Sequence, residues 1–360
     1  SVGVRLYKGS THRRANGKGT TGNGYDMTEV GKYVSDINFN SQNAAAFFEN
    51  IFRVNKKLLL IPGIRYEWLL GAANGRNGYT ASGGEIVLQN IKRSRSFLLA
   101  AIGAEYHITK GTEVYASFSQ AFRPIQFANL QAPPTTDIVD PNLKDAKGFN
   151  ADLGYRGKIK SFLQFDLSVF YLNYNNRIGT ITPNGKNYRL ITNVGASNSR
   201  GFESYIEFNP VRAFSKSTTT DCIVFASYSY TNATYSGNHA DASTKGKKVE
   251  NAPANILRAG ITYSIKTLQV TLQMSKVDET FSDANNTRVA SANGNTGLIP
   301  AYTVTDLSTT YKLSKIWNIK AGINNLMNAT YFTRRAGGFP GPGALPADGR
   351  NFFLTVAVKL

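Results

Sequence analysis

The chain has 360 residues, a formal net charge of +18 and 41% hydrophobic residues. This apolar content excludes a disordered chain. The longest apolar runs, at residues 58–61 and 97–104, are far shorter than the roughly 18 residues of a membrane-spanning helix. A single cysteine, Cys222, excludes an intrachain disulfide framework and a cysteine-rich metal site. The positive charge calls for an anionic partner, and nucleic acid, a small anion or lipopolysaccharide phosphates all fit.

Alternation of apolar and polar residues begins in residues 1–9 and recurs along most of the chain. It is clear in residues 163–171, 257–264 and 268–275, where the apolar sets include Leu167, Leu257 and Leu272. Successive side chains of a strand point to opposite faces, so each segment predicts a strand with one apolar and one polar face. The pattern gives about 14 strands, and residues 352–360 form a plausible closing strand.

The connections between these strands alternate between short and long. Short turns are expected at residues 55–57, 109–111, 158–160, 265–267 and 314–315, and long polar loops at residues 8–30, 71–84, 124–146, 236–251, 282–297 and 328–349. Short turns at one rim and long loops at the other are typical of a transmembrane barrel. The predicted fold class is therefore all-β, a transmembrane antiparallel β-barrel.

Aromatic residues support this interpretation. Tyr106, Tyr155, Tyr263 and Tyr311 each precede a short turn on the apolar face of a strand, and Trp317 follows the last of these turns. Such residues are expected to form a girdle at the membrane interface, with their polar atoms among the lipid headgroups. The alternative is that they are core residues at the end of a water-soluble sandwich.

No catalytic constellation is visible in the sequence. His12, His107 and His239 are far apart, and none has metal-ligand spacing with Cys, Asp or Glu. His107, beside a short turn, is expected at the membrane interface. The glycine-rich run at residues 16–22 lacks the Gly-Lys-Ser/Thr ending of a phosphate loop. We therefore expect no enzyme, no cofactor and no metal site.

Basic residues on the long-loop side are the candidates for ligand binding, because arginine holds carboxylates bidentately and a basic funnel concentrates anions. The candidate residues are Arg13, Arg14, Arg76, Arg123, Gln126, Arg189, Arg334 and Arg335. Arg123 with Gln126, and Arg13 with Arg14, are favoured because they flank the predicted mouth of the lumen. Alternatively, these side chains contact lipopolysaccharide phosphates or only keep the loops solvated.

Five segments, in order, resemble the TonB-dependent outer-membrane receptors. They are residues 115–124 (YASFSQAFRP), 140–143 (DPNL), 193–203 (NVG…GFE), 323–331 (INNLMNATY) and 349–352 (GRNF). Residues 44–50, 62–67, 281–287 and 299–302 are most similar to the ferric-citrate branch. Two positions depart from the family pattern. Leu360 stands where an aromatic residue is usual, and the acidic residue expected after residue 143 is displaced to Asp145.

The resemblance implies a 22-stranded barrel filled by an N-terminal plug, of which residues 1–360 would be the C-terminal barrel part without plug, TonB-binding box or first strands. It implies a monomeric outer-membrane barrel in contact with lipid and lipopolysaccharide. Such a receptor imports an anionic ferric chelate, with iron only as cargo, and is energised by TonB, ExbB and ExbD through the plug. It binds no nucleic acid. The alternatives are a passive porin, an adhesive barrel, or a soluble nucleic-acid-binding β-protein.

Overall fold

The computed structural model describes residues 1–15, 18–19, 29–30, 33–126, 137–181, 189–215, 217, 219–236, 244–336 and 342–359. Nearly all regular structure in these residues is β-strand. Among them, no helix has the length and apolar character needed to cross a bilayer.

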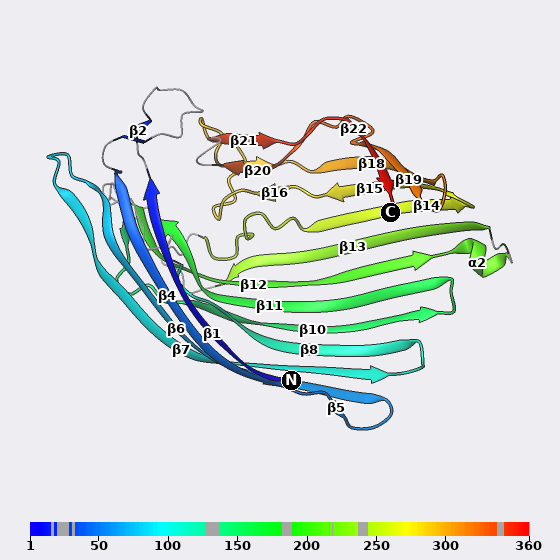
Figure 1. The fold of residues 1–360 in the computed structure, drawn as a ribbon, viewed down its shortest axis with the longest axis horizontal. Coiled ribbons are helices and arrows are strands. Elements are labelled where there is room, and N and C mark those ends of the chain that lie inside the picture. Colours follow the sequence, from blue (N-terminus) through cyan, green and yellow to red (C-terminus); the bar gives the residue numbers. More distant parts are fainter. Residues whose placement is uncertain are drawn as a thin grey trace.

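One large sheet dominates the described part of the chain, and fourteen of its strands follow one another along a single path (Figure 1). In path order these are β1 (Val2–Ala15), β4 (Ser35–Glu49), β6 (Leu58–Tyr79), β7 (Glu85–His107), β8 (Thr112–Arg123), β10 (Ala146–Ile159), β11 (Leu163–Ile181), β12 (Arg189–Phe208), β13 (Thr220–Ser236), β14 (Asn255–Ile265), β15 (Leu268–Val277), β18 (Tyr302–Lys312), β19 (Trp317–Asn324) and β22 (Asn351–Val358). Neighbours on this path pair antiparallel, which confirms the predicted fold class and strand number.

Several short strands and one short helix accompany this sheet. β5 (Phe52–Arg53) pairs with β6, and β9 (Asp137–Val139) pairs parallel to β12. The remaining short strands form three two-stranded pairs: β2 (Lys18–Gly19) with β3 (Glu29–Val30), β16 (Thr280–Phe281) with β17 (Leu298–Ile299), and β20 (Phe332–Ala336) with β21 (Gly343–Pro346). A five-residue helix, α2 (Pro210–Phe214), joins β12 to β13.

One face of the sheet is apolar and open to its surroundings. Leu153, Val169 and Phe202 lie in register on β10, β11 and β12 and are 52%, 54% and 41% exposed. Leu167 and Leu272, from the predicted apolar sets, are also exposed on their strands. A continuous exposed apolar surface of this kind is typical of a site of contact with membrane or protein.

The strands are longer than predicted at the long-loop end. Residues 71–79, expected in a loop, belong to β6, and β1 continues to Ala15 within residues expected as another loop. β6 pairs with β4 on one side and β7 on the other. The backbone N–H and C=O groups of its Gly- and Asn-rich end are therefore hydrogen-bonded, although these residues have low strand propensity. β7 has 23 residues, against the roughly 9–11 that cross a bilayer. β7 is therefore about twice as long as a strand that crosses a bilayer needs to be.

Candidate ligand-binding site on the polar face

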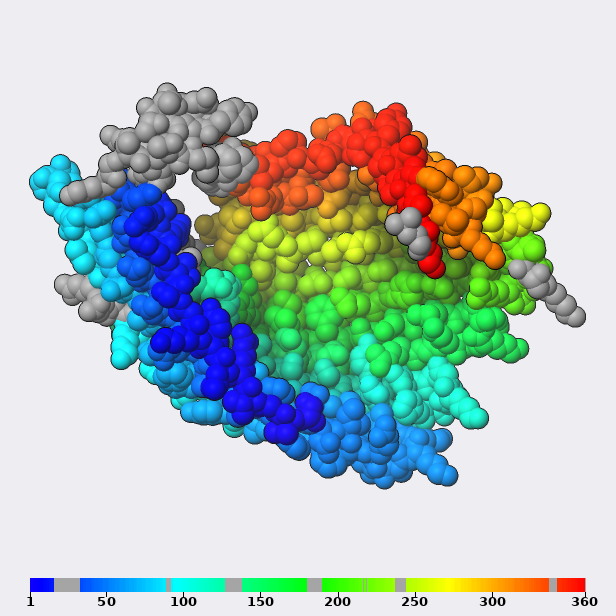
Figure 2. Space-filling model, viewed as in Figure 1, coloured from blue at the N-terminus to red at the C-terminus, as the bar shows by residue number. Residues whose placement is uncertain are grey.

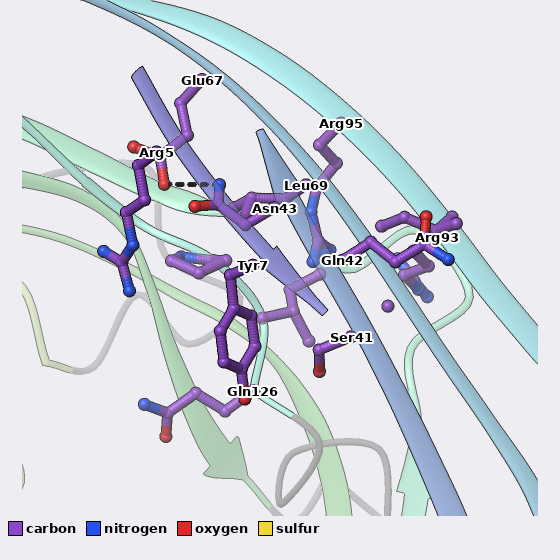
Figure 3. A pocket seen from close by; sticks show the side chains of 14 residues that line it. Arg5, Tyr7, Ser41, Gln42, Asn43, Glu67, Leu69, Arg93, Arg95 and Gln126 are labelled. Carbon is purple, nitrogen blue, oxygen red and sulfur yellow. Dashed lines mark hydrogen bonds between the residues drawn. The ribbon is translucent and has the colours of Figure 1, made fainter. Parts of the chain in front are cut away.

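The face opposite the apolar surface carries a pocket of about 350 Å³. Its walls include Arg5 and Tyr7 of β1, Asn43 of β4, Glu67 of β6, and Arg93 and Arg95 of β7 (Figure 3). Residues 124–126, which follow β8, complete it. A pocket with walls from β1 and from a segment beyond β8 requires the sheet to curl toward this polar face. Figure 2 shows that the molecule is hollowed between its blue N-terminal and red C-terminal strands.

The pocket has an excess of positive charge, because three arginines and one glutamate line it. Glu67 is already engaged: it accepts from Arg65 at 2.6 Å and from the Asn43 amide at 3.0 Å. Arg5 is exposed and has no hydrogen bond or ion pair to the described residues. Its guanidinium is thus available to an anion, for which it offers a bidentate fork.

The two arginines of β7 hold the segment that closes the pocket. Arg93 donates to the carbonyl oxygen of Leu143 at 3.3 Å. Arg95 faces Asp145, with Nε 3.3 Å from Oδ2, but the two groups are not aligned for a hydrogen bond. The Nη1 atom of Arg95 has no hydrogen-bond partner in the described part of the chain. Asp145 also accepts from the backbone N–H of Ile125 at 2.7 Å. A single carboxylate therefore joins β7 to the segment after β8.

Two of the segments that resemble the TonB-dependent receptors meet beside this pocket. Asn193 accepts from the N–H of Lys144 at 2.8 Å and donates to its carbonyl oxygen at 2.9 Å. Ile125, Leu143 and Ile191 form a small buried cluster underneath. The motif residues at 140–143 and 193–195 thus fix a loop against β11 and β12, which is a structural role.

Asp140 is held in the same loop. Its carboxylate accepts from the Thr192 hydroxyl at 2.6 Å and from the backbone N–H of Asn142 at 2.8 Å. These hydrogen bonds, that of Thr192 first, hold the pKa of the Asp140 carboxyl below its usual value because they stabilise the ionised form.

Three predicted residues lie on the pocket face. Gln126 lines the pocket itself. Arg123, at the end of β8, donates to the Tyr174 hydroxyl at 3.4 Å. Arg13 pairs in register with the buried Ile37, nearer the long-loop end.

Arg14 and Arg76 do not lie on that face, so of the favoured pair Arg13 and Arg14 only Arg13 is on the pocket side. Adjacent residues of a strand point to opposite faces. Arg14 pairs in register with Asp36, which in turn pairs with Arg76. Arg76 is further engaged by Glu85 at 2.8 Å and by the carbonyl oxygen of Tyr33 at 2.7 Å.

The other predicted arginines are away from the pocket or outside the described residues. Arg335 ties the β20–β21 hairpin to residues 294–298 by donating to the carbonyl oxygens of Gly294 and Leu298. Its neighbour Arg334 is exposed. Arg189 opens β12, but its side chain is outside the described part of the structure. Leu360 is outside it as well.

The predicted aromatic girdle residues all lie on the apolar face. Tyr106 and Tyr155 both pair in register with Val114 of β8. Tyr263, Tyr311 and Trp317 are between 41% and 45% exposed and are close to short turns. Their role at a membrane interface stays a prediction.

Arg5, Arg93 and Arg95 are pocket residues that were not predicted from the sequence. Arg93 and Arg95 occupy alternate positions in the run Lys92-Arg93-Ser94-Arg95-Ser96, a spacing that puts both on one face of a strand. That signal was available, because the run lies between the predicted loop at residues 71–84 and the predicted short turn at residues 109–111. Arg5 carries no comparable signal, since only the curl of the sheet brings it near β7.

The histidine prediction also needs correction. Glu105, His107 and Glu113 offer ligand atoms that all lie within 4.8 Å of one another. They come from opposite sides of the short turn at residues 108–111, where His107 and Glu113 are register partners. His107 therefore has two carboxylates at metal-ligand spacing, one on its own strand and one across the hairpin.

The family model described as "TonB dependent receptor-like, beta-barrel" matches residues 2–326. The chain belongs to the TonB-dependent receptor family. This family consists of outer-membrane transport receptors that interact with TonB and bind ferric chelates. An uncharacterised TonB-dependent receptor of Haemophilus influenzae is 24% identical over 227 residues, which cover 61% of this chain and 57% of that protein.

Solved structures share the fold of this family member. The ferric citrate transporter FecA in its unliganded form superposes with a TM-score of 0.80 at 21% identity, over 99% of this chain and 50% of that one. The copper transporter OprC gives 0.75 at 17% identity, over 99% and 53%. The siderophore receptor PiuA from Acinetobacter baumannii gives 0.68 at 20% identity, over 90% and 44%. The chain thus spans about half the length of these relatives.

Proposed function

We propose that this chain is the C-terminal barrel portion of a receptor that imports a ferric chelate across the outer membrane by TonB-dependent active transport. The family match over residues 2–326 carries the proposal. The exposed apolar face, with its tyrosines near the short turns, supports a place among outer-membrane lipids and lipopolysaccharide. A plug, coupled to TonB with ExbB and ExbD, would belong to the receptor outside this chain.

The proposed cargo is an anionic ferric chelate, with ferric citrate as the first candidate and another carboxylate siderophore as the next. Arginine-lined pockets suit such ligands because guanidinium groups bind carboxylates with paired, charge-assisted hydrogen bonds. Arg5 and Arg93 are the residues we expect to contact the chelate, with Gln126 at the pocket edge. The similarity to the ferric citrate transporter supports the fold of the site. The arginines that line the pocket of this chain support a negatively charged ligand.

Binding of ferric citrate to the full-length receptor in detergent micelles tests the assignment. Quenching of intrinsic protein fluorescence is a suitable signal, because Tyr7 lines the pocket. Replacing Arg5 or Arg93 with glutamine should raise the dissociation constant about 10-fold or more, the cost of one charge-assisted hydrogen bond. Arg14→Gln is the matched control, since Arg14 shares β1 with Arg5 but lies on the other face.

Two outcomes would contradict the proposal at different levels. Equally poor binding of ferric citrate and of ferric dihydroxamates would remove the ligand assignment and leave the family and fold intact. Steady ohmic conductance of the full-length protein in planar bilayers would instead favour a passive porin over an energy-coupled receptor.

A further inference from the structure

The hairpin between β7 and β8 gathers three metal-ligating side chains on the polar face at the short-turn end. Glu105 and His107 are two residues apart on β7, a spacing that places both on one face of the strand. Glu113 of β8 is the register partner of His107. The hairpin register therefore fixes the group, and each residue offers one ligand atom within 4.8 Å of the others.

The neighbouring Arg156 donates a hydrogen bond to one oxygen of each of the two carboxylates. Its Nε donates to Glu113 Oε1 at 2.6 Å, and its Nη2 to Glu105 Oε1 at 3.4 Å. The other oxygen of Glu113, Oε2, lies 3.0 Å from His107 Nδ1. Arg156 is itself placed over the ring of Tyr115, at 4.8 Å from the centroid. The guanidinium thus holds Oε1 of both glutamates and offsets part of their charge.

We propose that Glu105, His107 and Glu113 bind a divalent transition-metal ion such as Zn²⁺. Ligand atoms around a tetrahedral ion with bonds of 2.0–2.1 Å lie about 3.3 Å apart. The 3.0 Å between His107 Nδ1 and Glu113 Oε2 is close to that value, and rotation of the Glu105 side chain brings in the third ligand. Imidazole with carboxylates is a ligand set that suits zinc, and Arg156 acts as the outer partner that orients carboxylate ligands.

The site is open on one side. A cavity of about 500 Å³, lined by His107, Glu113 and Arg156, adjoins it. Lys110 and Lys158 line the same cavity and lower its attraction for free cations. Three protein ligands would leave room for water from this cavity to complete the coordination of the ion.

Titration of the full-length receptor in detergent with Co²⁺, followed by its visible absorption, tests the proposal. We expect saturable binding of one Co²⁺ per chain and its displacement by Zn²⁺. His107→Asn should abolish the absorption. Glu105→Gln should weaken Co²⁺ binding by more than about 10-fold, because loss of a residue that only hydrogen-bonds to a metal ligand already costs about that much. His12→Asn is the control, because His12 lies on the opposite face of the sheet. There it hydrogen-bonds to Asp36, the register partner of Arg14.

The far-ultraviolet circular dichroism of each variant shows whether its sheet is intact. Absence of saturable Co²⁺ binding by the unaltered receptor would overturn the proposal. Full binding by a folded His107→Asn variant, or equal loss in His12→Asn, would overturn it as well. Loss confined to His107→Asn and Glu105→Gln, with their sheets intact, supports it.

Discussion

The two ends of β7 differ sharply although they belong to one face of one strand. At the long-loop end, Arg93 and Arg95 line a pocket with excess positive charge. Arg93 donates to the carbonyl oxygen of Leu143, and Arg95 faces Asp145 of the same loop. At the short-turn end, Glu105 and His107 bring mainly acidic chemistry to the same face. Arg95 and Glu105 are ten residues apart, which corresponds to about 33 Å at the usual rise per residue of a strand.

This difference shows that a net charge of +18 is not spread evenly over the polar face. The basic end depends on a loop from beyond β8, so it is fixed by contacts distant in sequence. The acidic end depends on a hairpin and on Arg156 of the adjacent β10, so it is fixed by strand register. The following variants separate these two kinds of support.

The largest expected effect is on the sheet itself, at the contact between β12 and β13. A methyl group on Gly201, in the segment that resembles the receptor family, would collide with the backbone carbonyl oxygen of Tyr230 on β13. Gly201→Ala should lower the free energy of unfolding by about 3 kcal/mol, the upper range for overpacking. Gly103→Ala is the control, because its methyl group would be 3.6 Å from Ile61 and should change stability by less than about 1 kcal/mol. Equal urea midpoints for the two variants would contradict the close approach.

Asp145→Ala should have the next largest effect and should act on the basic end alone. It leaves the Ile125 N–H without its acceptor and the Arg95 guanidinium without the opposite charge that faces it, at a cost of about 2 kcal/mol. Asp145→Asn keeps an acceptor for Ile125 but loses the charge opposite Arg95, so urea unfolding should give an intermediate loss. Binding of Co²⁺ at the hairpin should be unchanged in both variants. Unaltered stability of Asp145→Ala would show that the loop is held by other contacts.

Arg156→Met should have a smaller effect, confined to the acidic end. The Arg156 side chain is 44% exposed, so loss of its ion pairs with Glu105 and Glu113 should cost less than about 1 kcal/mol in urea unfolding. Ferric citrate binding should stay unchanged. A loss of chelate binding as large as that of Arg93→Gln would mean that the two ends are coupled.

The smallest effect concerns Asp140, in the loop beside the pocket. Its folded pKa lies below the ordinary value of 3.8, so its ionised form contributes stability that is fully present above that value. The contribution disappears as the pH falls through the lowered pKa. Asp140→Asn should therefore melt at a lower temperature than the unaltered protein at pH 7, and the difference should vanish in strong acid. A difference that persists there would rule out this carboxylate as its cause.

Local pattern predicted the architecture well. The apolar sets containing Leu167 and Leu272 are exposed on one face, as the alternation required. The short turn near residue 266 also lies where it was predicted, and Lys266 there has positive φ. Loop lengths were predicted less well. Glycine and asparagine in residues 71–79 indicate a loop, but pairing on both sides of β6 overrides that local preference.

The sequence by itself determined the strands, the two faces and the family resemblance, because these depend on neighbours two residues apart and on short motifs. Only the tertiary structure decided which charged residues share a site. Arg5 and Arg93 line one pocket because the sheet curls, and Glu113 meets His107 because the hairpin fixes the register. Arg14 is separated from Arg13 by the alternation of faces. A strand pattern gives the face of each side chain, whereas its partners across the sheet follow from register and curvature.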